Sequence, residues 1–337
     1  MVGTAQGGAY HYAVKLSSNS SSTSAAAPAP QSQAWGISVP SGVSPQMQAP
    51  VIATVGGMQY AVFVVNTVTG TGSSAKTTST LYEVNVATGQ PASGTALSAA
   101  LPFTANSSMT YVSSTGTLWV GDNNGGVWSL NITGVAPNDA TGAVQSATTN
   151  PKAAINYVGY TEIGGLPYVW AATQTEITAF ALSGGTSQIL WASDGNSGYQ
   201  PNGSSMQSVA SNVVMPLQAA GQISAAPVLV NGVLVVPVYV PPDDATCGVG
   251  TGYYDLFDLL TGGPPKITIT YENNAVTNGV ISLGSGIPLS PTVYVTPTGT
   301  VIYPGSSEPP GPQSPNPISP IDFGGSVMNK PLAWRQY

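Results

Sequence analysis

The chain alternates hydrophobic and polar residues over many short stretches, and most of these stretches end at a glycine. In VGDNNGGVWSLNITG (Val120 to Gly134), such an alternating run follows the sequence Asp-Asn-Asn-Gly-Gly. Successive side chains of a β-strand point to opposite faces, so a period of two predicts a strand with one buried face. Asn and Gly tolerate the positive φ that tight hairpin turns need. The pattern therefore predicts two strands joined by a hairpin turn.

This stretch has an internal copy. VGTAQGGAYHYAV (Val2 to Val14) aligns with VGDNNGGVWSLNI (Val120 to Ile132), so that Val-Gly, Gly-Gly and the alternating run coincide. Looser copies share a short alternating strand and a glycine turn, and they lie at 79–90, 175–185 and 252–263. We interpret all five as the closing strands of a repeated unit.

A second repeated element precedes these closing strands. It consists of two short strands joined by a turn, and in three copies it opens with Ala-Pro or Ser-Pro. The copies lie at 49–65, 109–121, 155–173, 226–240 and 290–303. One opening and one closing element make a four-strand meander of roughly 40 to 60 residues, the size expected for a propeller blade.

These repeats predict an all-β fold, a β-propeller of about six to seven irregular blades with quinoprotein-like repeats. The first closing strand lacks an opening and the last opening lacks a closing strand, so we expect complementary N- and C-terminal strands to close the ring. We expect the propeller to span 1–307, with irregular excursions at 17–33 and 195–215. The Pro-rich segment 308–337 is expected to pack back on the propeller. A sandwich of hairpins is the alternative.

The composition limits the classes of function that we expect. Only 6% of the residues are charged, and 13 acids against 6 bases give a net charge of −7. Nucleic-acid binding is therefore not expected, because it requires basic side chains that neutralise phosphates. A surface with so few carboxylates should change little between neutral and acidic pH, which is compatible with an extracellular, acidic setting. No run of 18 apolar residues predicts a membrane span, and MVGTAQGGAY does not resemble a signal peptide.

Catalytic chemistry has few candidates. The chain has one histidine, His11, inside an alternating strand, and one cysteine, Cys247. Neither a Ser-His-Asp relay with its G-x-S-x-G elbow nor a zinc site is predicted from them. Asp255 and Asp258 lie three apart in a strand, so we expect them on opposite faces, one toward solvent and one bonding the following turn. No catalytic residue and no cofactor is therefore predicted.

Two further acidic positions are candidate sites. Asp243 and Asp244 follow a proline pair in a loop, where they are calcium candidates even though the spaced EF-hand ligand pattern is missing. Asp122, with Gly125 and Gly126, does not fit a phosphate cradle, because a strand and not a helix follows. We predict that these three residues form a structural turn in which Asp122 bonds local backbone N–H groups.

Other residue types leave alternatives open. Asn-x-Ser/Thr sequons, which are acceptors for N-glycosylation in secreted proteins, occur at Asn19, Asn106, Asn131 and Asn202. The 16 tyrosines, 6 tryptophans and 5 phenylalanines fall mostly in predicted strands. We expect most of them to pack in the core, and a carbohydrate-stacking surface is the alternative.

Several motifs resemble a known family. The segments YVWAATQTEITAFAL and LWVGDNNGGVWSLNITG look like blades of quinoprotein-type propellers. VGDNNGGVWSLNITG, LGSGIPLSPTVYVTPTGTVIY and the terminal PLAWRQY resemble the C-terminal propeller of type IV pilus tip adhesins of the PilY type. The aspartate-rich calcium loop that this family often carries is not readable here, which puts calcium regulation in doubt.

The resemblance implies a non-enzymatic protein at the tip of a pilus, acting in pilus assembly and surface adhesion. Its expected partners are pilin or minor pilin subunits and a host, mineral or abiotic surface, and its expected location is the cell surface. Two alternatives stay open: a quinone-dependent dehydrogenase-like propeller, and a surface-layer or lectin-like binding module. The lone Cys247 argues against the enzyme, which commonly has a vicinal cysteine pair.

Overall fold

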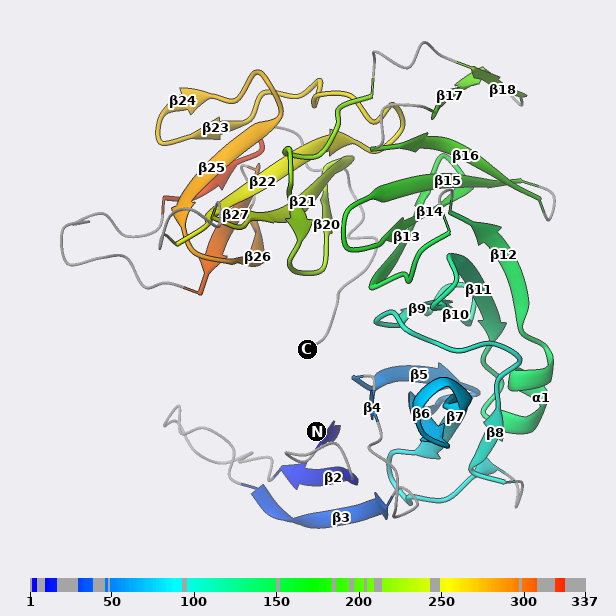
Figure 1. The fold of residues 1–337 in the computed structure, drawn as a ribbon. Coiled ribbons are helices and arrows are strands. Elements are labelled where there is room, and N and C mark those ends of the chain that lie inside the picture. The colour runs from blue at the N-terminus through cyan, green and yellow to red at the C-terminus, as the bar shows by residue number, and fades with distance from the viewer. Residues whose placement is uncertain are drawn as a thin grey trace. The chain divides into compact units, whose positions relative to one another are not determined.

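A computed structural model gives the structure of the chain. It describes residues 49–92, 96–149, 152–183, 186–193, 214–242, 249–296, 299–307 and 319–324, and the secondary structure of six further strands outside these ranges. The chain divides into two compact units, which meet in sequence between residues 154 and 155. Figure 1 shows that both units are built from short, twisted antiparallel sheets.

The first unit holds three sheets. Strands β1 (Val2–Thr4), β2 (Tyr10–Leu16) and β3 (Pro30–Ser38) form one sheet in that order. The second sheet has the order β4-β6-β7-β8, and β5 also pairs with β6; its strands are β4 (Gln46–Met47), β5 (Val51–Val55), β6 (Met58–Thr69), β7 (Lys76–Asn85) and β8 (Ser98–Ala100). The third is a four-stranded meander of β9 (Thr110–Val112), β10 (Thr117–Gly121), β11 (Gly126–Asn131) and β12 (Val144–Thr148).

The second unit also holds three sheets. The first is a meander of β13 (Tyr157–Ile163), β14 (Leu166–Ala172), β15 (Ile177–Ser183), β16 (Thr186–Ala192), β17 (Ser197–Asn202) and β18 (Ser205–Ser208). The second has the order β19-β21-β22-β25, with β20 beside β21; its strands are β19 (Gln222–Ile223), β20 (Val228–Val230), β21 (Val233–Val240), β22 (Thr251–Asp258) and β25 (Val280–Ser285). The third has the order β24-β23-β28-β27-β26, from β23 (Thr270–Tyr271), β24 (Asn274–Ala275), β26 (Pro288–Thr296), β27 (Gly299–Ser306) and β28 (Ile321–Asp322).

The predicted hairpins are present, and their turns have the expected chemistry. β20 and β21 are joined by Asn231 and Gly232, both at positive φ (49° and 81°). β13 and β14 are joined by Gly164 and Gly165 in the same way (60° and 80°). Two successive residues at positive φ give the turn twist that matches the twist of the flanking strands. The all-β fold of antiparallel meanders is therefore confirmed, and the described strands form six sheets.

Helix is scarce, as expected. Within the described ranges the helices are α1 (Ala136–Thr141) and the 3-10 turn η1 (Gly72–Ser74). Neither is long enough to cross a membrane, and no other described segment is a helix that could do so. The central strands instead carry the core: β6 and β22 are buried on both faces over most of their length. Three apolar clusters result, one in the first unit and two in the second.

Two sequence interpretations need correction. The segment 195–215 was expected to be irregular, but it contains the hairpin β17–β18, and the excursion 17–33 ends inside β3. The alignment of Val2 with Val120 predicts that the two hairpins share a register. In the structure Val120 pairs with Trp128, whereas Val2 pairs with Ala13, three positions beyond the residue that the alignment predicts. The turn lengths differ, so the repeat conserves the hairpin but not its register.

The two ends of the chain have their own sheet partners. β2 lies between β1 and β3, and β27 lies between β26 and β28. β28 comes from the segment 308–337, and the buried side chains of Ile321 and Phe323 pack into an apolar cluster of the second unit. The rest of that segment, 308–318 and 325–337, lies outside the described residues. Ring closure by complementary ends stays a prediction, and so does the separate C-terminal segment.

Candidate functional site

The calcium candidates Asp243 and Asp244 lie outside the described residues, as does Cys247. His11 lies in β2, for which only the secondary structure is described. Over the described ranges, no three His, Cys, Asp or Glu side chains come together as they would around a metal ion. Calcium binding by Asp243 and Asp244 therefore stays a prediction.

Asp122, Gly125 and Gly126 lie together in the β10–β11 hairpin. The Asp122 carboxylate, which is almost fully buried, accepts hydrogen bonds from the backbone N–H groups of Asn124 and Gly126, both at 2.7 Å to Oδ1. Its Oδ2 accepts the indole N–H of Trp128 at 2.8 Å. Trp128 in turn stacks on Phe103, with ring centroids 4.3 Å apart. Both oxygens of the carboxylate therefore serve the turn.

Glycine is required at the two positions of this turn for different reasons. Gly125 has φ +82°, a conformation that a side chain rarely adopts, and a Cβ there would lie 2.6 Å from Thr149 Oγ1. Gly126 has no such φ, but a Cβ there would collide with the Asp122 carboxylate and with the Trp128 indole. Gly126 is therefore required by the space that the Asp122–Trp128 hydrogen bond occupies.

Asp255 and Asp258 follow the prediction only in part. Asp258 does bond the following turn, since its Oδ1 accepts the N–H groups of Leu260 and Thr261 and the hydroxyl of Thr261. The prediction that the other acid faces solvent is wrong: Asp255 is fully buried, because β22 lies between β21 and β25 with both faces covered. One of its oxygens accepts the Gln218 N–H at 3.0 Å, and the other has no hydrogen-bond donor of good geometry among the described residues. Burial raises the pKa of Asp255 to about 6.

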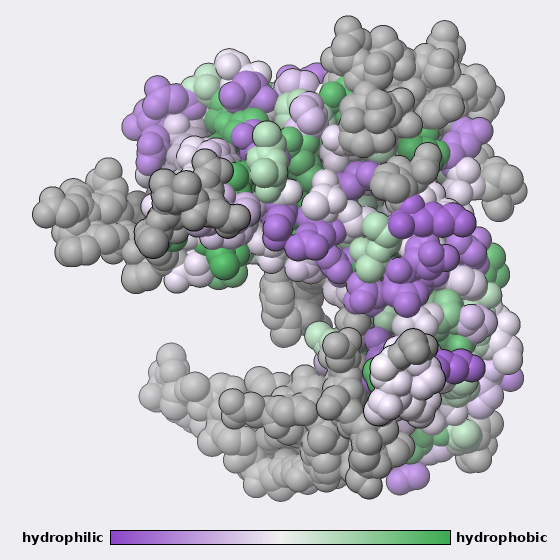
Figure 2. Space-filling view, in the orientation of Figure 1, coloured by the Kyte–Doolittle hydropathy of each residue, from purple (hydrophilic) through white to green (hydrophobic). Residues whose placement is uncertain are grey.

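Exposed apolar side chains gather on the β26–β27 hairpin. We call Leu289, Tyr294 and Tyr303 the Tyr294 surface, because the strand register places these three side chains on one face of the hairpin. They are between 42% and 54% exposed, although large apolar side chains are usually buried. The rings of Tyr294 and Tyr303 meet edge to face with centroids 5.3 Å apart. Neither strand contains a charged residue. Figure 2 colours the described residues of one face of the molecule by hydropathy, and hydrophobic residues are visible there among hydrophilic ones.

The opposite side of this hairpin is fixed to the neighbouring sheet. The buried Tyr254 of β22 donates its hydroxyl to the Leu289 carbonyl at 2.8 Å and accepts the Gly305 N–H at 3.2 Å. Ser290 donates to the Ala226 carbonyl, and Ser224 donates to the Pro288 carbonyl. Burial raises the pKa of Tyr254 to about 12, so it remains a donor at any physiological pH. The exposed rings therefore stand on a rigid support.

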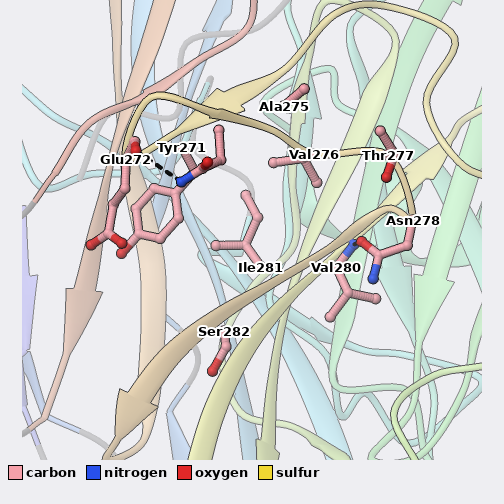
Figure 3. Close-up of a pocket in the computed structure, with 10 residues that line it drawn as sticks. Tyr271, Glu272, Ala275, Val276, Thr277, Asn278, Val280, Ile281 and Ser282 are labelled. Carbon is pink, nitrogen blue, oxygen red and sulfur yellow. Dashed lines mark hydrogen bonds between the residues drawn. The ribbon is translucent and has the colours of Figure 1, made fainter.

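A shallow pocket lies beside this sheet. It has a volume of about 300 Å³, and β23, β24, β25 and the chain between them line it. Figure 3 shows Tyr271 and Glu272 on one side, Thr277 and Asn278 on the other, and Ile281 between them. The Asn274 amide donates to the Glu272 carbonyl, and the Asn278 side chain accepts the Val280 N–H. Several of its polar groups thus serve the local backbone.

Sequence reasoning missed one pair of acids. Glu83 on β7 and Asp139 on α1 are both buried, at 1% and 3% exposure, and they lie close together. Sequence spacing relates an acid only to its near neighbours, and Glu83 and Asp139 lie far apart along the chain. The signal that could have found Glu83 is its place in STLYEVNV, where it alternates with Leu81 on the apolar side of a strand.

No family model matches the chain, and no curated protein matches it. Among solved structures, the chain is similar to the crystal structure of BamB from Moraxella catarrhalis. The two share 11% identity at a TM-score of 0.39, over 98% of this chain and 92% of that one. A similarity at this level defines neither a family nor a function, and the fold class stands on the strands described above.

Proposed function

We propose that this chain is a non-enzymatic, extracellular β-propeller that attaches to surfaces. The observation that carries this proposal is the Tyr294 surface: exposed aromatic and aliphatic side chains, with no charge in either strand, on a hairpin fixed from behind by Tyr254. Exposed apolar patches on monomeric proteins commonly mark interaction sites. Leu289 on the same face as the tyrosines favours an apolar surface over a sugar, which would need more hydrogen-bonding groups.

Adsorption to beads tests the attachment. The protein and the double variant Tyr294→Ser, Tyr303→Ser are compared on alkyl-coated and hydroxyl-coated beads. Removing two half-exposed rings should lower adsorption to alkyl beads roughly tenfold or more. Val144→Ser, at a 59% exposed position of the first unit, is the matched control and should adsorb like the parent protein. Equal adsorption by the double variant and the parent would contradict attachment through this surface.

The finer proposal places the chain at the tip of a type IV pilus, where it acts in pilus assembly and adhesion with pilin or minor pilin subunits. Its support is the resemblance of VGDNNGGVWSLNITG, LGSGIPLSPTVYVTPTGTVIY and PLAWRQY to tip adhesins. Immunogold labelling of filament preparations should place the chain at filament ends, and pilins should co-purify with it. Label along the cell body alone, or turnover of an alcohol with an added quinone, would overturn this assignment.

A further inference from the structure

We propose that Glu83 and Asp139 form a buried proton-binding site, in which a neutral Glu83 carboxyl donates a hydrogen bond to the Asp139 carboxylate and so joins α1 to β7. This inference concerns the first unit and does not depend on the proposed attachment function. It makes the stability of the protein respond to pH through one identifiable proton.

The surroundings of Glu83 are apolar. On β7 it lies opposite Val62 of β6, and on the same face of the sheet are Leu81 of its own strand and Tyr60 of β6. The Glu83 side chain is 1% exposed, and no described group donates a hydrogen bond to either of its oxygens. An ionised carboxylate in this position would be strongly unfavourable, because it would have lost its hydration without gaining a donor.

Asp139 has the complementary arrangement. Its Oδ2 accepts the Thr133 N–H and its Oδ1 accepts the Thr133 hydroxyl, both at 2.6 Å. Both oxygens of Asp139 therefore act as hydrogen-bond acceptors. The Glu83 carboxyl lies within hydrogen-bonding reach of Asp139. Two carboxylates cannot hydrogen-bond each other without a proton, so Glu83 supplies it.

Among the described residues, no basic side chain lies beside Glu83 whose positive charge could take the place of that proton. The elements packed on Glu83 are β6, β8 and α1. Their titratable groups are Tyr60 of β6 and Asp139 of α1, while β8 has none. On β7 itself, Lys76 lies at the far end of the strand and Tyr82 points to the opposite face. Burial, and then the charge and hydrogen bond of Asp139, raise the pKa of Glu83 from 4.5 to about 9.

The direction of the pH effect follows from linkage. The folded protein keeps the Glu83 proton up to about pH 9, whereas the unfolded chain loses it near pH 4.5. Between these values the folded state binds one more proton, so stability falls as the pH rises. The contribution is complete in acid and is lost toward alkaline pH. Glu83 alone therefore makes the folded state progressively less stable as the pH rises from about 4.5 to about 9.

The test is urea unfolding of the full chain between about pH 6.5 and 8.5, above the titration of Asp255. The unfolding equilibrium constant of the parent protein should rise by up to about tenfold per pH unit. In Glu83→Gln, whose amide donates to Asp139 without titrating, this rise should disappear. Glu272→Gln, at an exposed position, is the matched control and should keep the parent slope. A parent slope equal to that of Glu83→Gln would overturn the proposal.

Two further measurements keep the test decisive. If Glu83→Gln does not fold, isotope-edited infrared spectroscopy of glutamate-labelled parent protein at neutral pH should show the band of a buried neutral carboxylic acid; its absence would overturn the proposal. Calcium or sodium ions could instead occupy the pair. If either ion stabilises the parent protein at pH 7.5 but not Glu83→Gln, the site binds a metal cation and the proton assignment is wrong.

Discussion

Trp128 donates its indole N–H to the carboxylate of Asp122 across 2.8 Å, and the same carboxylate accepts two backbone N–H groups of the turn between them. The turn that the sequence suggested is thus held by three hydrogen bonds to one buried charge. The acid of this glycine-rich loop therefore stabilises a hairpin turn.

Replacing that carboxylate measures its contribution. Asp122→Ala removes three charge-assisted hydrogen bonds and leaves buried donors unpaired, so we expect a loss of about 2–3 kcal/mol of unfolding free energy. Urea unfolding followed by tryptophan fluorescence measures it. Asn123→Ala, at the adjacent exposed position, should stay within about 0.5 kcal/mol of the parent protein. An equal effect of the two substitutions would refute the role of Asp122.

Glycine at 126 is required by space. In Gly126→Ala the new methyl group displaces the Asp122 carboxylate from Trp128, and we expect a loss of about 2 kcal/mol or more with a shifted Trp128 emission. Gly57→Ala offers the comparison, because its φ is +80° and nothing lies within 4 Å of the added Cβ. That variant should lose only about 1–2 kcal/mol, from backbone strain alone, with unchanged emission. Unchanged emission in Gly126→Ala would contradict the proposed collision.

Asp255 gives the second unit its own pH dependence. Burial raises the pKa of Asp255 from its ordinary value of 3.8 to about 6, so the folded state binds one more proton than the unfolded chain between these values. Stability contributed by the neutral acid is therefore complete below pH 3.8 and lost as the pH rises to about 6.

Asp255→Asn keeps an oxygen for the Gln218 N–H and never ionises. At neutral pH we expect it to be more stable than the parent protein by on the order of 1–3 kcal/mol, and equal to it in strong acid. Unfolding curves at both pH values measure the difference. A variant that is less stable at neutral pH would show that the Asp255 carboxylate has a partner in solution.

The buried Trp191 joins two sheets of the second unit. Its indole N–H donates to the Leu259 carbonyl at 2.7 Å, and its ring stacks on Phe257. Trp191→Phe keeps an aromatic ring but leaves the carbonyl unpaired and part of the space empty. We expect a loss of about 2–4 kcal/mol, measured by urea unfolding. An unfolding free energy equal to that of the parent protein would contradict this role of the Trp191 side chain.

Local patterns predicted most of the fold. The hairpins at Gly164–Gly165 and Asn231–Gly232 follow from residue types at neighbouring positions, so a single sequence is sufficient to find them. β17 and β18 were missed because SGYQPN and SMQS are polar and contain no alternating apolar residues. β23 and β28 have two residues each, too few to show any period.

The burial of the acids could not be predicted from the sequence, for a different reason. The closeness of Glu83 to Asp139 depends on how α1 packs on β7, which no spacing in the sequence encodes. The burial of Asp255 depends on both faces of β22 being covered. The Tyr294 surface could not be predicted either, because an alternating strand pattern does not indicate which of its aromatic rings remain exposed.

The hairpin β23–β24 is encoded between β22 and β25, yet its sheet partner is β28, with Thr270 opposite Asp322 and Tyr271 opposite Ile321. Since ribosomes deliver the chain from its N-terminus, residues 270–275 emerge well before the strand that pairs with them. One edge of this hairpin therefore has no strand to pair with until residue 322 has left the ribosomal exit tunnel. A chain shortened before residue 321 would keep β26–β27 but lose the strand that connects it to β23–β24, and we expect such a product to expose that edge to aggregation.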